Sequence, residues 1–441
     1  MSLKAEIVDQ VRAAGVVGAG GAGFPTHVKL EAQVERVLAN GASCEPLLSS
    51  DPYLMERRAE TVVKGLKAVM TATGASAGTI CLKGKHQEAL AAVSRAADQA
   101  GVSVFELGDF YPAGDEQVLV YEVMGRVVPE GGLPLQVGAV VSNVESLINV
   151  AQALEGRPVT DRWLTVAGEV ARPLIARVPL GVSVGEVIAL AGGALRRDFL
   201  VVLGGPMMGR VTGDLGTPVT KTTSGIIVLP PEHNVVAVKV RDPERVRYVT
   251  RVACCQCSRC TDLCPRNLLG HSLAPHLIMR SLSAPRGPAR EAWPDALICS
   301  ECGLCEKFAC PMMISPREVN AQLKQELLAG GTKRAPGRTE YRPSPFRALR
   351  RVPTQRLVQR LGLVRYDVHP EFAEPSAPPA QVALPLKQHL GAPAQPVVKA
   401  GDRVKRGDLV GEIPPRALGA RVHASIDGKV VAVTDHVIIR G

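Results

Sequence analysis

The chain opens with apolar residues at the spacing of an amphipathic helix. Within residues 3–14 the apolar positions that share one helical face are Leu3, Ile7, Val8 and Val11. Further along, residues 78–83 and 101–106 are short β-rich runs, and residues 85–100 between them carry a helical pattern. Strand–helix–strand alternation of this kind predicts an α/β layer. We expect this layer to belong to a first domain over residues 1–157.

The pattern changes after the first domain. Residues 163–170 and 199–204 are strand-like, and residues 184–191 between them carry a short helical pattern. This succession predicts a compact mixed α+β module over residues 158–235. In the last part of the chain, short strand patterns are separated by Gly-Asp turns, which predicts a small sandwich over residues 378–441.

The sandwich has a half-repeat pattern that resembles lipoyl- and biotinyl-type modules. In such modules a modified lysine sits at a hairpin tip between the two halves. The nearest candidate, Lys429, instead opens a strand in the sequence Asp427-Gly428-Lys429-Val430. We therefore expect a structural module without swinging-arm chemistry.

Composition places the chain among multidomain globular proteins. Its length of 441 residues predicts about three domains. Its apolar content of 46% is ordinary for a globular protein. No charge-free apolar run reaches roughly 18 residues, so no direct membrane insertion is expected. The formal net charge of +10 lies mostly in residues 333–365, within a basic linker over residues 331–377. Only Tyr341 and Phe346 are interleaved with these charges, so nucleic-acid binding is disfavoured. We expect the linker to dock an acidic partner or the chain's own cysteine-rich domain.

Two cysteine runs lie in a domain that we place at residues 236–330. They read Cys254-x-x-Cys257-x-x-Cys260-x-x-x-Cys264-Pro265 and Cys299-x-x-Cys302-x-x-Cys305-x-x-x-x-Cys310-Pro311. In two-cluster ferredoxins the fourth cysteine of each run ligates the other cluster. We therefore expect two [4Fe–4S] clusters with crossed ligands. One set is Cys254, Cys257, Cys260 and Cys310, and the other is Cys299, Cys302, Cys305 and Cys264.

Other uses of these cysteines fit less well. Structural zinc typically uses two separated C-x-x-C pairs, and disulfides are disfavoured because we expect no signal peptide at the start of the chain. Cys255 is the spare thiol, since only Cys254 keeps the two-residue gap to Cys257, and we expect Cys255 to be packed. Two adjacent clusters form a one-electron wire, so the spacing predicts electron transfer.

A glycine-rich loop follows the first predicted helix. Its glycines are Gly18, Gly20, Gly21 and Gly23. Glycines let backbone amides approach phosphate oxygens closely. A Rossmann fingerprint would need a strand before the glycines, and here a helix precedes them. The ordinary dinucleotide interpretation is therefore disfavoured.

The loop belongs to a longer set of motifs that resembles one family. The motifs are Gly18 to Lys29, Asn40-Gly-Ala-Ser-Cys-Glu45-Pro, Tyr111-Pro-Ala-Gly114-Asp115-Glu116-Gln, and Ser142-Asn143-Val-Glu-Ser146. In this order they resemble the flavin subunit of respiratory complex I and its relatives, the RnfC-type electron-transport subunits. With the sandwich at the C-terminus, the whole chain is most similar to the PduS-type cobalamin reductases.

The resemblance implies a multidomain α/β and α+β fold. Its parts would be a Rossmann-like FMN and NADH domain (1–157), an SLBB β-grasp module (158–235), a two-[4Fe–4S] ferredoxin-type domain (236–330), the basic linker (331–377) and a barrel-sandwich hybrid module (378–441). Carried over by motif, the FMN phosphate region would be held by Gly18, Gly20, Gly21, Gly23 and Lys29. The flavin would be lined by Asn40, Tyr111, Gly114, Asp115 and Asn143, and the nicotinamide side by Glu45 and Glu116. Ser43 and Ser142 depart from the family pattern, which predicts altered flavin binding or hydride orientation.

The resemblance also implies an activity. Electrons would pass from NADH through FMN and two [4Fe–4S] clusters to a corrinoid, for coenzyme B12 recycling in diol utilisation. No catalytic acid or base is expected, because outer-sphere electron transfer needs none. The implied partners are the corrinoid substrate, an adenosyltransferase and the shell proteins of a bacterial microcompartment in the cytoplasm. Two alternatives stay open: an RnfC-type subunit of a membrane ion-translocating complex, and a non-enzymatic interaction module with purely structural clusters.

Overall fold

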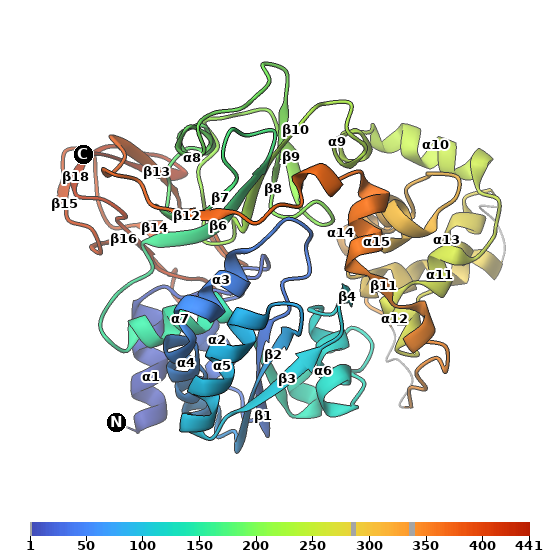
Figure 1. Cartoon of the computed structure of the whole chain (residues 1–441), viewed down its shortest axis with the longest axis horizontal. Coiled ribbons are helices and arrows are strands. Elements are labelled where there is room, and N and C mark those ends of the chain that lie inside the picture. Colours follow the sequence, from blue (N-terminus) through green and yellow to red (C-terminus); the bar gives the residue numbers. More distant parts are fainter. Residues whose placement is uncertain (1, 284–287, 335–339) are drawn as a thin grey trace.

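The computed structural model describes residues 2–283, 288–334 and 340–441. In Figure 1 the N-terminal domain lies below a second sheet, a helical cysteine-rich region lies to one side, and the C-terminal strands lie to the other. Within the described ranges, no helix is both long and apolar enough to span a bilayer.

The first domain is built on a four-stranded sheet of order β3-β2-β1-β5, in which every pairing is parallel. Its strands are β1 (Arg36–Gly41), β2 (Ala77–Lys83), β3 (Ser103–Leu107) and β5 (Ala139–Asn143). The helices are α1 (Leu3–Ala13), α2 (Thr26–Leu30), α3 (Ser50–Arg57), α4 (Ala59–Thr73), α5 (Gln87–Ala100), α6 (Glu116–Met124) and α7 (Val144–Ala153). The predicted first helix and the strand–helix–strand unit over residues 78–106 are confirmed as α1 and β2–α5–β3.

Alternation along the strands gives this sheet two buried faces. Val37, Ile80 and Leu82 belong to a core shared with α1, α4, α5 and α7. Leu38 and Cys81 point the other way, into a smaller core with Leu119 of α6. Parallel strands covered on both faces carry continuous apolar runs, as β2 does. The ligand-binding edge of such a sheet is the carboxyl end of its strands.

The second domain is a six-stranded mixed sheet of order β12-β7-β6-β10-β8-β9. Its strands are β6 (Asp161–Gly168), β7 (Leu174–Pro179), β8 (Leu200–Leu203), β9 (Arg210–Thr212), β10 (Gly225–Leu229) and β12 (Glu371–Ala373), and α8 (Val184–Leu190) packs into its core. The predicted strand, helix and strand of this module are confirmed as β6, α8 and β8. The sheet is fixed to the first domain by a buried ion pair, in which Arg162 Nη1 lies 2.7 Å from Glu145 Oε2.

The cysteine-rich region is helical in its described part. Its elements are α9 (Asn234–Lys239), α10 (Pro243–Ala253), α11 (Arg259–Asp262), α12 (Pro265–Leu268), α13 (Pro275–Ser281), η2 (Pro288–Ile298), η3 (Cys305–Ala309) and α14 (Pro316–Ala329). Prolines open α10, α12, α13 and α14, where the missing N–H breaks no helical hydrogen bond. Cys254, Cys264 and Cys310 cap α10, α12 and η3. Cys260 lies within α11 and Cys305 begins η3, and the other cysteines of the region lie in connecting loops.

The described part of the basic linker packs against the chain itself. Its elements are η4 (Ala348–Arg350), β11 (Val352–Pro353), α15 (Thr354–Leu361) and η5 (Val364–Tyr366), and β11 pairs with β4 (Phe110–Tyr111) of the first domain. Arg347 and Arg351 form ion pairs with Glu122, whose side chain is 11% exposed. Arg334 contacts both Glu130 and Asp295. The linker therefore contacts the cysteine-rich region, which was one of the two expectations, and it also docks on the first domain, which sequence analysis did not anticipate.

Docking of the linker supplies a hydrogen-bond partner to a buried lysine of the first domain. The Lys83 side chain is fully buried at the carboxyl end of β2. Its ammonium donates to Thr354 Oγ1 at 2.9 Å and lies 3.0 Å from Asp109 Oδ1. A buried ammonium needs such partners, because leaving it unpaired is costly.

The C-terminal module consists of two small antiparallel sheets, with orders β13-β19-β18-β15 and β14-β16-β17. Its strands are β13 (Gln381–Pro385), β14 (Gln395–Pro396), β15 (Arg403–Val404), β16 (Leu409–Glu412), β17 (Val422–His423), β18 (Gly428–Val433) and β19 (His436–Arg440). Lys429 lies in β18 opposite Arg403 and Arg440 rather than at a hairpin tip, as predicted.

Three modules meet at one buried lysine. Lys221 Nζ donates to the carbonyl oxygens of Gly15 and Arg421, each at 2.7 Å. These residues belong to the first domain and to the C-terminal module, while Lys221 precedes β10 of the second. Burial lowers the pKa of Lys221 to about 7.

Candidate functional site

The structure brings together the four cysteines of the first expected cluster, which we call the outer group: Cys254, Cys257, Cys260 and Cys310. Cys254 ends α10, Cys260 lies in α11, and Cys310 follows η3. Burial, followed by the charges of the other three thiols, raises the pKa of Cys260 to about 12. Cys257 is exposed, and Cys254 and Cys260 are half-buried. Cys310 is buried, so the outer group is open to solvent on the side of Cys257.

The second expected set also meets, and we call it the inner group: Cys264, Cys299, Cys302 and Cys305. All four thiols are buried and line one pocket. Burial is the largest cause of the raised pKa of each, and neighbouring cysteines add to the rise at Cys264, Cys302 and Cys305. Each group contains three cysteines of one run and the last cysteine of the other, which is the crossed arrangement that the spacing predicts.

The two groups supply the type of ligand that iron–sulfur clusters use. Burial raises the pKa of Cys260 and of Cys305, the cysteines around each of them add to that rise, and thiolates are the ligands of [4Fe–4S] clusters. Across residues 2–283, 288–334 and 340–441, no group of His, Cys, Asp or Glu is placed to hold one metal ion. The expectation of a packed thiol at Cys255 is wrong, since that side chain is exposed.

The glycine loop lies over the carboxyl edge of the first sheet. It is closed by two hydrogen bonds, from Gly18 N to Phe24 O (2.9 Å) and from Gly23 N to Gly18 O (3.1 Å). A Cβ at Gly20 would lie 3.5 Å from Asn143 Cβ, so the loop passes directly over the end of β5. Gly21 has φ +110° and faces open space. The amides of Gly18 and Gly23 are used within the loop, whereas Gly20 and Gly21 at its tip are exposed to solvent.

Two of the expected flavin residues lie side by side at this edge. Asn40 is the penultimate residue of β1 and is in register with Asn143 of β5. Asn40 Nδ2 donates to Gly114 O at 2.9 Å, and a Cβ at Gly114 would lie only 3.0 Å from Ala42 Cβ. Asn143 Oδ1 caps α7, and its Nδ2 donates to Asp51 Oδ2 at 2.9 Å. Glycine at position 114 therefore permits the close approach of two loops here.

Lys29 and Glu116 are paired with each other. Lys29 Nζ lies 3.2 Å from Glu116 Oε1 and donates to Val141 O at 3.0 Å. The Glu116 side chain is 46% exposed, so solvent screens this pair. Lys29 thus lies near the end of β5, within the same edge of the sheet as the glycine loop.

Tyr111 and Asp115 turn toward the inner group. Tyr111 is buried, and its hydroxyl donates to Cys302 O at 2.7 Å. Both Asp115 oxygens accept from Arg266, at 2.6 and 2.9 Å, while Oδ1 also caps α6. Arg266 follows Cys264 by two residues. Sequence analysis did not single out Arg266, although its place after the Cys-Pro pair was the available signal.

Glu45 points to the second domain. Its carboxylate accepts from Met207 N at 2.8 Å and Met208 N at 2.9 Å, in the turn between β8 and β9. Burial raises the pKa of Glu45, and the two amides and Lys239 oppose that rise. Lys239 Nζ donates to Met207 O at 3.0 Å. No local sequence signal connects these residues, because 162 positions separate Glu45 from Met207.

Family models of known domains match four separate parts of the chain. Family models match as the Nuo51 FMN-binding domain (residues 11–152), the SLBB domain (164–211), a 4Fe-4S dicluster domain (253–315) and the RnfC barrel sandwich hybrid domain (371–441). They confirm the expected multidomain α/β and α+β fold class, and they support FMN and iron–sulfur cofactors.

Curated relatives cover the chain to different extents. Cobalamin reductase PduS of Salmonella typhimurium is 47% identical over 100% of this chain and 98% of that protein. The PduS of Citrobacter freundii is 46% identical, over 99% and 96%. One component of the Na(+)-translocating ferredoxin:NAD(+) oxidoreductase complex of Acetobacterium woodii is 37% identical, but over 58% of this chain and 56% of that protein.

A solved structure shares the fold. An NAD+-reducing [NiFe]-hydrogenase in the H2-reduced state superposes with a TM-score of 0.50 at 23% identity, covering 76% of this chain and 64% of that one. The chain thus spans less than two thirds of that structure, and the likeness concerns architecture alone.

Proposed function

This chain belongs to the PduS cobalamin reductase family, and we propose that it passes electrons from NADH through FMN and two [4Fe–4S] clusters to a cobalt corrinoid. NADH as the donor and two as the number of clusters are part of the proposal. Bound FMN would accept a hydride and release its two electrons singly. NADH thereby becomes NAD+, and each one-electron step of the corrinoid cobalt consumes one of the two electrons.

The observation that carries the proposal is the contact between the first domain and the inner group. Tyr111 reaches Cys302 O, and Asp115 holds Arg266 beside Cys264. Both Tyr111 and Asp115 belong to the motif that we propose lines the flavin. Electron transfer needs short separations, and these contacts hold the loop of Cys302 and the segment after Cys264 against the edge of the sheet that we propose binds the flavin.

The difference in solvent exposure between the inner and outer groups indicates the direction of electron transfer. The inner group is buried next to the first domain, whereas the outer group includes the exposed Cys257. We propose that the inner group receives electrons from the flavin and that the outer group delivers them to the acceptor. A buried relay also limits access of oxygen and water to the first centre.

The remaining site roles are proposals supported by the sheet edge. The glycine loop and Lys29 would hold the FMN phosphate, with Asn40, Gly114 and Asn143 along the ring. Because Lys29 is paired with Glu116, phosphate binding would exchange one partner of Lys29 for another. Glu45 would act from the side of the second domain, near the nicotinamide.

A cysteine variant tests the proposed order of the electron carriers. Cys302→Ala should lose inner-cluster absorbance and reduction of aquacobalamin, while NADH still bleaches the flavin in anaerobic stopped-flow. Cys255→Ala is the matched control, because that thiol is exposed and lies in neither group. If NADH no longer bleached the flavin in the Cys302 variant while FMN stayed bound, the proposed order of carriers would be wrong.

The RnfC-type alternative is favoured by 37% identity to one component of an ion-translocating complex, although over little more than half of this chain. We propose the corrinoid route because PduS proteins match from end to end. An adenosyltransferase, shell proteins and a microcompartment location belong to the same proposal. Titration of the reduced protein with aquacobalamin and, separately, with ferredoxin distinguishes the two functions.

A further inference from the structure

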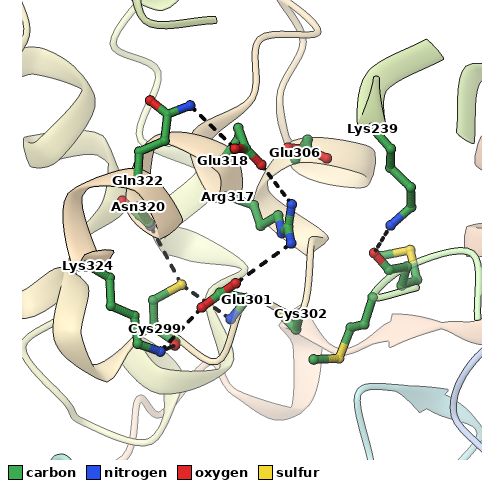
Figure 2. A network of polar contacts seen from close by, with 12 residues as sticks. Lys239, Cys299, Glu301, Cys302, Glu306, Arg317, Glu318, Asn320, Gln322 and Lys324 are labelled. Carbon is green, nitrogen blue, oxygen red and sulfur yellow. Dashed lines mark hydrogen bonds and ion pairs between the residues drawn. The ribbon is translucent and has the colours of Figure 1, made fainter. Parts of the chain in front are cut away.

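One face of α14 is directed at the loop that carries Cys299. Arg317, Asn320 and Lys324 follow one another at intervals of three and four residues, which places them on the same side of the helix. Figure 2 shows these side chains converging on the segment from Cys299 to Cys302.

Two of these side chains fix the backbone and the acidic residue of the loop. Lys324 Nζ donates to Cys299 O at 3.0 Å and lies 3.3 Å from Glu301 Oε1. Arg317 Nη2 lies 3.7 Å from Glu301 Oε2. The loop that supplies three inner-group cysteines is thus anchored by a helix that begins six residues after Cys310 of the outer group.

Asn320 forms a hydrogen bond with the sulfur of Cys299. Its side chain is fully buried, and Nδ2 donates to Cys299 Sγ at 3.8 Å. Its Oδ1 is also buried and has no hydrogen-bond partner. An unsatisfied buried carbonyl costs about 1–3 kcal/mol, so an apolar residue would serve packing better here. A buried polar group of this kind calls for a functional explanation.

The two groups differ in whether a side chain donates a hydrogen bond to one of their sulfurs. Nearby backbone amides oppose the rise in pKa at Cys260 and Cys310 of the outer group, and they do the same at Cys264 and Cys302 of the inner group. Cys299 accepts from Glu301 N at 3.4 Å and from Asn320. Within the part of the chain that the structure describes, Asn320 is the one side chain that donates a hydrogen bond to a sulfur of either group. Hydrogen bonds to cluster sulfurs are among the factors that set a cluster's reduction potential.

We propose that Asn320 is a positioning residue that raises the reduction potential of the inner cluster by donating a hydrogen bond to Cys299 Sγ. The inference deepens the proposed function, on which its cluster depends. One electron added to the cluster increases the negative charge on its sulfurs, so an N–H donor stabilises the reduced form more than the oxidised form. The electron that leaves the flavin is thereby drawn to the inner group.

The test is a redox titration of the anaerobically purified full chain carrying Asn320→Leu. Dithionite is the reductant, and EPR monitors the reduced clusters. Loss of one hydrogen bond should lower the ratio of reduced to oxidised inner cluster about fivefold at a fixed potential. For a one-electron couple that is a downward shift of about 40 mV, since tenfold equals 59 mV. The inner couple is the one that Cys302→Ala removes.

Two comparisons keep the test decisive. Gln322→Leu changes the same helix where the side chain bonds Glu318 and the Pro243 carbonyl, and it should leave both couples unchanged. Asn320→Ala, with reconstituted clusters, replaces Asn320→Leu if the larger side chain prevents iron loading. An unshifted inner couple, an equal shift in both couples, or failure of both Asn320 variants to load the inner cluster would overturn the proposal. Because neither NADH nor a corrinoid enters the titration, failure of the proposed electron route would not produce these results.

Discussion

The Arg266–Asp115 pair offers the sharpest test of how the cluster loop is held against the first domain. The two side chains are 9% and 12% exposed and share two short hydrogen bonds. Charges about 4 Å apart interact by about 4 kcal/mol at an effective dielectric constant of about 20. Removing one partner of a buried pair costs about 3–5 kcal/mol, because the other charge is left uncompensated. We therefore expect Arg266→Gln to destabilise the cluster region by about 3 kcal/mol, the lower end of that range.

The assay is a double-mutant cycle. Arg266→Gln, Asp115→Asn and the double variant are compared by urea unfolding under anaerobic conditions, followed at the iron–sulfur absorbance. The double variant should lose clearly less stability than the two single losses added together, because one interaction is removed twice in that sum. In stopped-flow with NADH, Arg266→Gln should slow cluster bleaching while the flavin phase keeps its rate. Additive stability losses, or an unchanged bleaching rate, would refute the idea that this pair fixes the interdomain contact.

Two further predictions concern interdomain hydrogen bonds. Tyr111→Phe leaves Cys302 O without its buried donor, so we expect a loss of about 1–3 kcal/mol in urea unfolding at the cluster absorbance; a variant with unchanged stability would contradict this. Burial lowers the pKa of Lys221 from 10.5 to about 7, so above pH 7 the unfolded chain binds a proton that the folded chain lacks. The free energy of unfolding should therefore rise from pH 7 toward 10.5, and Lys221→Met should flatten that rise in thermal melts at several pH values. An equal slope in the variant would show that another group is responsible.

Local chemistry made the cysteine groups predictable. The spacing of each run fixes which thiols can share a cluster, and the structure brings Cys310 to the first run and Cys264 to the second, as that rule requires. The α/β layer was predictable for the same reason, since β2, α5 and β3 each carry their periodicity within a short segment. The roles of individual flavin residues and the domain boundaries at residues 157, 235, 330 and 377 stay predictions.

Contacts between residues far apart in the chain could not be predicted from the sequence. Arg351 and Glu122 are 229 positions apart, and nothing near either residue indicates the other. The excess of positive charge in the linker was visible in the sequence, but its acidic partners in the first domain were not. Tyr111 and Asp115 were recognised as members of a motif, yet their contacts with Cys302 and Arg266 arise only when two domains pack. Such contacts depend on tertiary structure rather than on the pattern around each residue.

The burial of Lys83 limits where the chain can be shortened. Its ammonium depends on the Thr354 hydroxyl, which arrives from a segment 271 positions later. A protein ending after the cysteine-rich region would retain every thiol and every glycine of the loop. It would nevertheless expose a core lysine and the edge of β4, so trimming at the evident module border would damage the N-terminal half of the molecule.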